Sequence, residues 1–142
     1  MIIAIDFDGT LVEQDRPYDD LTTPPELRPG ALDALKSMKA AGHIHLLWSA
    51  RTNRALLYSP RWDPLYSSGI VAIDQRHWKS ALDLHWARFR QMTEFVEREL
   101  PGLIDEIDPG LQGKPCVDLF IDDRTPSGPI DWDEIRARYG AW

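Results

Sequence analysis

The first ten residues read MIIAIDFDGT, an apolar run followed by two acids. Such a β-branched run is typical of a buried strand. Asp6 and Asp8 stand two positions apart, so strand alternation would point both side chains to one side and Phe7 to the other. Gly9 and Thr10 then allow the backbone to turn sharply where a ligand must come close.

A helix and a second strand follow this first strand, which we place at residues 2–7. The connector at 13–29 carries four prolines, which argue against a helix or a central strand there. Apolar residues then recur at helical spacing over 30–41, and Gly42 supplies the stop. The run at 44–48 is a second strand. Strand, helix and strand in this order form a βαβ unit, which predicts a parallel sheet.

The remaining segments continue the alternation. They are predicted as a strand at 70–73, a helix at 75–100 capped by Asp74, strands at 103–107 and 117–121, and a last helix at 132–139 with a capping box of Asp131 and Glu134. The long helix would span about 39 Å, so in a small domain it needs a kink or a protruding end. Its apolar stripe, expected in the core or at a dimer contact, is Trp78, Leu82, Trp86, Phe89, Met92, Val96 and Leu100.

The composition indicates one acidic globular domain over residues 1–142. Apolar residues make up 43% and charged residues 27%, an ordinary globular balance. The net charge of −7 disfavours nucleic acid as a partner. No run approaches the roughly 18 apolar residues of a membrane span, and the N-terminus lacks the basic region of a secretory signal. A lone cysteine, Cys116, excludes an internal disulfide, so we expect a cytoplasmic protein.

Two predicted strands end in carboxylates. Asp6 and Asp8 follow the first strand, and Asp122 and Asp123 follow the strand at 117–121. In an open α/β sheet, ligands bind beyond the carboxyl ends of strands where the strand order reverses, so these acids should converge. Clustered carboxylates repel one another unless a cation lies among them, and Mg²⁺ is the simplest such ion. One carboxylate could then attack phosphorus while another moves protons.

Four motifs in this order resemble those of the haloacid dehalogenase (HAD) superfamily, whose commonest members are Mg²⁺-dependent phosphohydrolases. Residues 6–11, DFDGTL, resemble its DxDGT signature. Ser49 matches a Ser or Thr that ends a strand, Lys114 matches a lysine ahead of the last core strand, and Asp122-Asp123 match the acidic fourth motif. The resemblance implies a Rossmann-like, three-layer α/β/α core with a mostly parallel sheet and a minimal cap.

The resemblance also implies a role for each motif residue. Asp6 would be the nucleophile and a metal ligand, and Asp8 would be the general acid/base and a metal ligand through its backbone carbonyl. Ser49 would hydrogen-bond the transferring phosphoryl group, and Lys114 would neutralise its charge. Asp122 would bind Mg²⁺ directly, with its neighbour Asp123 behind it. The substrate-binding positions are then Gly9, Thr10, Ser49, Ala50 and Arg51.

An insert at about 52–74 departs from the usual HAD layout, in which large caps follow the first motif or the third strand. It would overhang the site as a lid or specificity loop, and a packed surface loop is the equal alternative. Three arginines suit phosphate or carboxylate groups, and three aromatic residues suit stacking on a sugar or base: Arg51, Arg54, Arg61, Tyr58, Trp62 and Tyr66. A cap this small leaves the site exposed, so a homodimer is one way to cover it.

Several assignments stay open on the sequence alone. An ordinary strand-end hydroxyl is the alternative for Ser49, and Lys79 competes with Lys114 as the motif lysine. The favoured function is hydrolysis of a small phosphorylated metabolite through an aspartyl-phosphate. Phosphotransfer to an acceptor other than water and non-catalytic binding of a phosphorylated ligand are the alternatives. A pure binding module has no use for both a nucleophile and a proton shuttle, which Asp6 and Asp8 would supply.

Overall fold

The computed structural model describes residues 1–17, 19–52, 75–109, 114–124 and 128–141, without the side chains of 75–82. Its strands are β1 (Ile2–Ile5), β2 (Ile44–Leu47), β3 (Glu106–Ile107) and β4 (Leu119–Ile121), and its helices are α1 (Ala31–Ala40), α4 (Gln75–Glu99) and α5 (Trp132–Tyr139). The predicted strand at 70–73 and nearly all of the 52–74 insert lie outside the described residues.

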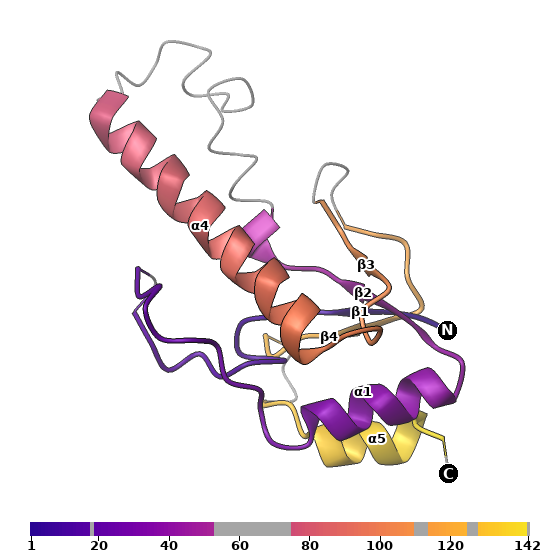
Figure 1. Ribbon diagram of the computed structural model, residues 1–142. Coiled ribbons are helices and arrows are strands. Elements are labelled where there is room, and N and C mark those ends of the chain that lie inside the picture. The colour runs from indigo at the N-terminus through magenta and orange to yellow at the C-terminus, as the bar shows by residue number, and fades with distance from the viewer. Residues whose placement is uncertain (18, 53–74, 110–113, 125–127, 142) are drawn as a thin grey trace.

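The strands form one parallel sheet in the order β3-β2-β1-β4 (Figure 1). The central strand, β1, places Ile3 opposite His45 of β2 and Ile5 opposite Ile121 of β4. Ile3, Ala4 and Ile5 are all buried, as expected for a parallel strand that is covered on both faces. The parallel sheet predicted from the βαβ unit is therefore confirmed.

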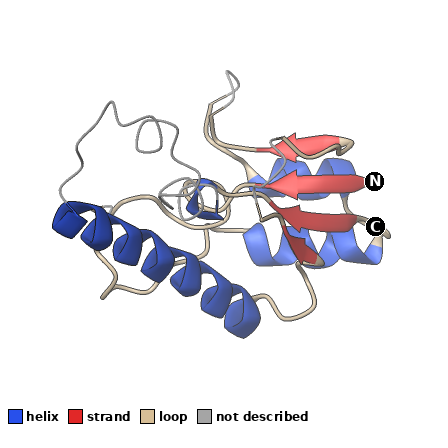
Figure 2. Ribbon diagram, turned by 90° about the horizontal axis from the view of Figure 1, so that it is seen from above, coloured by secondary structure: helices blue, strands red, loops and turns tan. Residues whose placement is uncertain are grey.

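The helices surround this sheet unequally. α1 and α5 lie side by side on one face, and α4 passes beside the carboxyl ends of the strands (Figures 1 and 2). The C-terminal half of α4 joins the core, where the ring of Phe95 meets that of Phe7 edge-on at 5.7 Å between centroids. The N-terminal half extends past the sheet, so the long helix has a protruding end (Figure 1). No helix in the described part of the chain is both long and apolar enough to cross a bilayer.

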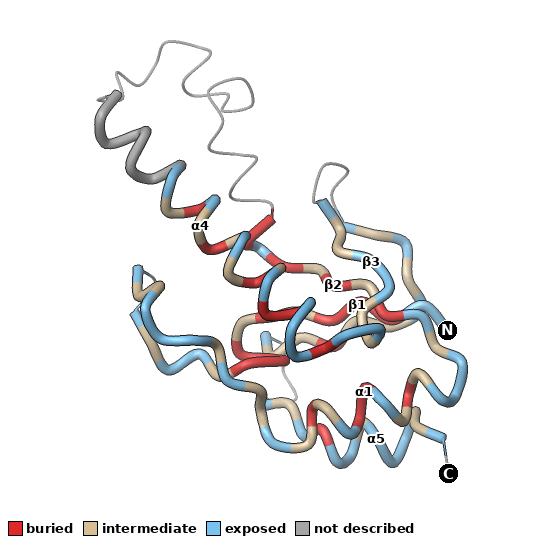
Figure 3. The backbone as a smooth tube through the Cα atoms, viewed as in Figure 1, coloured by how far each residue is buried: buried red, intermediate tan, exposed pale blue. Residues whose placement is uncertain are grey.

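The protruding end of α4 corrects part of the predicted apolar stripe. Met92, Val96 and Leu100 are buried as expected. Buried positions recur along α4 from its middle to its C-terminal end (Figure 3). Trp86 is 39% exposed although its neighbour His85 is buried, so Trp86 lies on the outer side of the helix there. Its ring forms a T-shaped pair with that of Phe89, at 5.7 Å between centroids. Phe95, which lies outside the predicted stripe, is buried instead.

The third strand is shorter than predicted. The run at 103–107 pairs with β2 only over Glu106–Ile107. The chain first turns at the end of α4, where the N–H of Leu103 donates to the carbonyl of Leu100 at 3.0 Å. This turn uses the backbone that would have extended the strand.

β1 and β4 are also shorter than the predicted strands at 2–7 and 117–121. The N–H of Asp6 still donates to the carbonyl of Ile121 at 3.0 Å. One residue further along, the carbonyl of Phe7 accepts hydrogen bonds from three N–H groups of the following turn, those of Thr10, Leu11 and Val12. The strand therefore ends where the backbone turns back on itself.

The last helix begins as predicted. The Asp131 side chain accepts hydrogen bonds from the N–H groups of Asp133 at 3.0 Å and Glu134 at 3.2 Å, which satisfies two of the donors left free at a helix start. The helix over Trp132–Tyr139 and its Asp131 cap are confirmed. Gly42, with φ +84°, lies just past the end of α1 as predicted.

Candidate functional site

The candidate site lies where the strand order reverses. From β1 the chain continues to β2 and β3 on one side, and it later returns to β4 on the other side of β1. The carboxyl ends of β1 and β4 therefore form the switch point of the sheet. Carboxylate oxygens of Asp6, Asp122 and Asp123 lie there within 4.8 Å of one another. This cluster could hold a metal ion, and it joins residues more than a hundred positions apart.

Gly9 and Thr10 fit closely around Asp123. Gly9 has φ +78°, and a Cβ atom there would lie only 2.4 Å from Oδ2 of Asp123, so only glycine fits without a shift. Thr10 Oγ1 accepts the N–H of Asp123 at 3.0 Å and lies 3.4 Å from its Oδ1. The indole N–H of buried Trp132 donates to the Thr10 carbonyl at 2.8 Å. The two residues that the sequence predicts beside a substrate thus position a carboxylate of the cluster.

Asp8 lies outside this carboxylate cluster and forms an ion pair instead. Its two oxygens accept from Nε and Nη2 of Arg51 at 2.8 and 2.7 Å, and Nη2 of Arg88 lies 3.6 Å away. Arg51 is buried, and its Nη1 donates to the carbonyl of Arg88 at 2.9 Å and to Oε1 of Gln91 at 3.0 Å. Its guanidinium also lies 4.8 Å from the centroid of the Phe7 ring. Arg51 therefore links the segment after β2 to both Asp8 and α4.

Most of the predicted site residues surround one cavity of about 180 Å³. Its lining comprises five of them and three further residues: Asp6, Asp8, Ser49, Ala50 and Arg51, with Gln14, Arg88 and Arg124. Ser49 is only 3% exposed, and its hydroxyl oxygen accepts the N–H of Arg51 at 3.2 Å. The cavity thus brings carboxylates, a hydroxyl and guanidinium groups together.

Lys114 lies elsewhere. Its Nζ stands 4.2 Å from the centroid of the Phe120 ring, a cation–π contact on an exposed lysine. It lines neither this cavity nor the adjoining one of about 150 Å³ formed by Asp6, Trp48, Ala50, Asp122 and Arg124. The side chain of its rival Lys79 lies outside the described residues, as do the insert residues Arg54, Tyr58, Arg61, Trp62 and Tyr66.

Arg124 is a cation of the site that the sequence reasoning missed. It lines both cavities, and its N–H donates to Oδ1 of Asp122 at 3.0 Å. Its place directly after Asp122-Asp123 was a usable signal. Arg88 and Gln91 of α4 were also missed, and no local pattern marks them, because their contacts with Asp8 and Arg51 span 37 to 80 positions.

Repulsion and burial disfavour the ionised form of Asp6. Its pKa is raised from 3.8 to about 7, chiefly because burial removes the carboxylate from water. A hydrogen bond from the backbone of Phe7 opposes this shift, and repulsion from nearby carboxylates, led by Asp122, adds to it. Burial and the contact with Asp122 also raise the pKa of Asp123. A cation among these oxygens would offset the repulsion, and a set of oxygen donors alone fits a hard ion such as Mg²⁺.

The raised pKa of Asp6 predicts how stability depends on pH without metal. Between about pH 4 and pH 7 this carboxyl holds a proton in the folded chain only, so the free energy of unfolding should fall as pH rises through that range. In Asp6→Asn most of this slope should disappear, leaving the metal-free variant more stable than wild type at pH 7.5 by about 2–4 kcal/mol. Urea unfolding in EDTA across the range measures both. Parallel curves for the two proteins would contradict the assignment.

The site therefore consists of a carboxylate cluster at the switch point and an adjoining cavity that contains Ser49 and arginine side chains. Asp8 and Arg51 lie at the wall of that cavity, and Gly9 and Thr10 lie against Asp123 of the cluster. Comparison with known proteins adds no relative, since no protein-family model, curated protein or solved structure matches the chain.

Proposed function

We propose that the protein is a Mg²⁺-dependent phosphohydrolase with a HAD-like, three-layer core, and that it acts on a small phosphorylated metabolite through an aspartyl-phosphate. The convergence of Asp6, Asp122 and Asp123 within 4.8 Å carries this proposal. It is supported by the cavity that places Ser49 and guanidinium groups beside Asp6. Donors of this kind suit a phosphoryl group, whose charge spreads over its oxygens during transfer.

The proposed reaction has two displacements at phosphorus. First, an oxygen of Asp6 attacks phosphorus, the bond to the leaving oxygen breaks, and that oxygen takes a proton from Asp8. Then water attacks phosphorus and gives a proton to Asp8, while the bond between Asp6 and phosphorus breaks. The products are the alcohol and inorganic phosphate, and both aspartates return to their starting states.

The cations of the site have separate tasks in this proposal. Mg²⁺ held by Asp6, Asp122 and Asp123 would neutralise negative charge close to the phosphoryl group. Arg51 and Arg124 both line the cavity of about 180 Å³, which we call the phosphoryl cavity. Arg51 is buried there, whereas Arg124 is exposed. Both Asp8 oxygens accept from Arg51, and each keeps a further lone pair that can bind the transferred proton.

The Asp8–Arg51 pair favours a second candidate function, non-catalytic binding of a phosphorylated ligand. Both oxygens of Asp8 accept hydrogen bonds from a buried guanidinium, whereas a proton donor needs an oxygen that faces the leaving group. In a protein that only binds phosphate, the ion pair between Asp8 and Arg51 would stay formed. Such a protein would bind inorganic phosphate with Mg²⁺ present and turn over no ester.

The decisive test is hydrolysis of para-nitrophenyl phosphate with excess Mg²⁺ and with EDTA. We expect turnover with Mg²⁺ only, together with acid-quenched protein that carries one phosphoryl group on the peptide containing Asp6. Release of phosphate equal to the alcohol formed indicates hydrolysis, whereas transfer to added glycerol indicates a phosphotransferase. Phosphate binding without turnover of any ester would favour the second candidate.

A further inference from the structure

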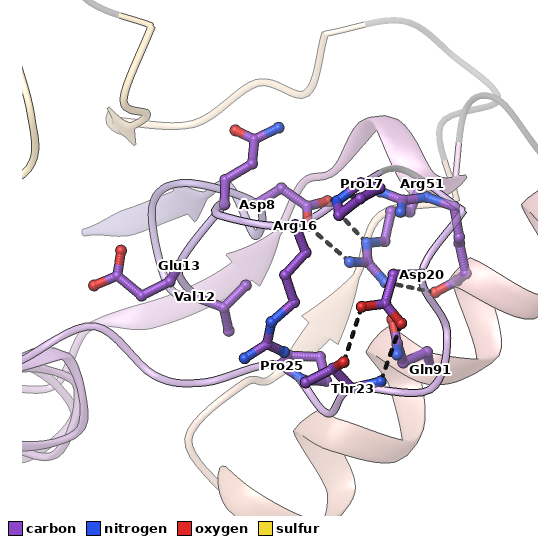
Figure 4. Close-up of a pocket in the computed structure, with 12 residues that line it drawn as sticks. Asp8, Val12, Glu13, Arg16, Pro17, Asp20, Thr23, Pro25, Arg51 and Gln91 are labelled. Carbon is purple, nitrogen blue, oxygen red and sulfur yellow. Dashed lines mark hydrogen bonds and ion pairs between the residues drawn. The ribbon is translucent and has the colours of Figure 1, made fainter.

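A second cavity adjoins the phosphoryl cavity at Asp8 (Figure 4). It measures about 100 Å³, and the two cavities share four lining residues: Asp8, Gln14, Arg51 and Arg88. Figure 4 shows Arg16, Asp20 and Thr23 contributed by the loop after β1, and Gln91 by α4. The cavity therefore lies between that loop and α4, and Asp8 belongs to the walls of both cavities.

Its position relative to Asp8 makes it the place for the leaving group. This step rests on the proposed function, in which Asp8 gives its proton to the leaving oxygen while Asp6 attacks phosphorus. Asp6 lines only the first of the two cavities, whereas Asp8 lines both. The rest of the substrate, which begins at the oxygen beside Asp8, would therefore extend into the second cavity.

Asp20 is a fixed hydrogen-bond acceptor in this cavity. Its Oδ1 accepts the backbone and hydroxyl donors of Thr22, both at 2.9 Å, and the N–H of Thr23 at 3.2 Å. Its Oδ2 accepts only the hydroxyl of Thr23, at 2.8 Å, among the described contacts. A carboxylate oxygen can accept more than one hydrogen bond. The loop thus holds Asp20 in place and leaves acceptor capacity at Oδ2.

The charged groups of the cavity already have partners within the protein. Asp8 is paired with Arg51, Glu13 lies 3.6 Å from Arg28, and Arg16 donates to the carbonyl of Pro24. A charged group on the ligand would therefore find no unpaired opposite charge among these groups. What the wall offers is a set of hydrogen-bond donors and acceptors close together.

A hydroxyl group matches such a wall, because it donates and accepts at once. The polar lining residues that the structure describes carry carboxylate, amide, hydroxyl and guanidinium groups. The cavity volume of about 100 Å³ is several times the ~10–15 Å³ that a cavity needs to hold one water molecule, which is room for a short chain. We propose that this cavity binds the leaving group of the substrate, and that this group is the hydroxylated chain of a sugar or polyol phosphate.

The test compares kcat/KM for four esters: ribose 5-phosphate, phosphoserine, adenosine 5′-monophosphate and para-nitrophenyl phosphate. We expect ribose 5-phosphate to exceed each of the others at least about tenfold, the effect of one or two added hydrogen bonds to charged groups. In Asp20→Asn the ratio for ribose 5-phosphate over para-nitrophenyl phosphate should fall about tenfold. The Asn carbonyl can keep the three bonds at Oδ1 while an NH₂ group replaces the acceptor Oδ2.

Two further variants serve as a control and as a second test of the Asp20 contact. Asp19→Asn makes the same change of charge at the neighbouring exposed acid and should leave the ratio unchanged. Thr23→Val keeps the charge but removes the hydroxyl that fixes Oδ2 of Asp20. The ratio should therefore fall, by less than in Asp20→Asn, and this variant serves if Asp20→Asn folds poorly. Preference for phosphoserine or the nucleotide, or an equal effect of Asp19→Asn, would overturn the proposed ligand while phosphatase activity stands. Failure to hydrolyse any of the four esters would instead count against the proposed function itself.

Discussion

Asp6→Asn should lower the turnover of para-nitrophenyl phosphate by at least about a thousandfold, because it removes the attacking carboxylate. The amide that replaces it is a poor nucleophile and cannot form the aspartyl-phosphate. It is also a weaker ligand for a hard cation at the end of β1. Steady-state kinetics with saturating Mg²⁺ and acid-quench mass spectrometry should both show the loss.

The matched control for this change is Asp33→Asn on the exposed face of α1. It alters the charge of the protein equally, at a residue that belongs neither to the carboxylate cluster nor to the two cavities that Asp6 lines. The value of kcat should therefore stay within about twofold of wild type. Asp6→Asn should remain folded, because the amide has the size of the carboxyl and relieves repulsion from Asp122. Activity of Asp6→Asn within tenfold of wild type would show that another group attacks phosphorus.

Gly9→Ala should impair both folding and metal binding, and comparison with Gly42→Ala separates the causes. Both glycines have positive φ, +78° and +84°, so alanine at either costs about 1–2 kcal/mol of stability. A Cβ at position 42 meets nothing within 4 Å, whereas a Cβ at position 9 would lie 2.4 Å from Oδ2 of Asp123. Only Gly9→Ala must therefore displace a carboxylate of the cluster.

The expected result is a further loss that appears in Gly9→Ala alone. Displacing even a group that only supports a ligand commonly weakens a metal site about 10- to 100-fold. Because Asp123 is a proposed ligand itself, we expect the affinity for Mg²⁺ to fall by about tenfold or more. Gly42→Ala should bind Mg²⁺ as wild type does. Calorimetric titration with Mg²⁺ and urea unfolding of both variants measure the two effects. Equal Mg²⁺ affinity in the two variants would remove Asp123 from the metal site.

Local signals were strong enough to predict most of the fold. Hydrophobic periodicity, the stop at Gly42 and the cap at Asp131 act over a few neighbouring residues, so α1 and α5 appear where expected. Strand ends were less predictable, because they depend on which backbone groups a following turn uses. The Phe7 carbonyl, which accepts three N–H groups, is the clearest case.

The meeting of Asp6 with Asp122 followed from topology. Once the first and last strands are neighbours in a parallel sheet, their carboxyl ends lie together, and acids that follow them must converge. The separation of Asp8 from this cluster could not be predicted from the strand topology. It depends on Arg51, whose guanidinium is fixed by the carbonyl of Arg88 and the amide oxygen of Gln91 on α4.

The amino-acid order alone therefore specifies a parallel α/β fold with acids after two of its strands, because strand and helix patterns and the turn at Gly9 are encoded locally. It does not specify what each side chain contacts. Hydrogen bonds to Arg88 and Gln91 of α4 position the Arg51 guanidinium that pairs with Asp8. Lys114 lies over the Phe120 ring and does not line the phosphoryl cavity. Those contacts join residues that are distant in sequence or sit on different elements, and their free energy exists only once the chain has folded.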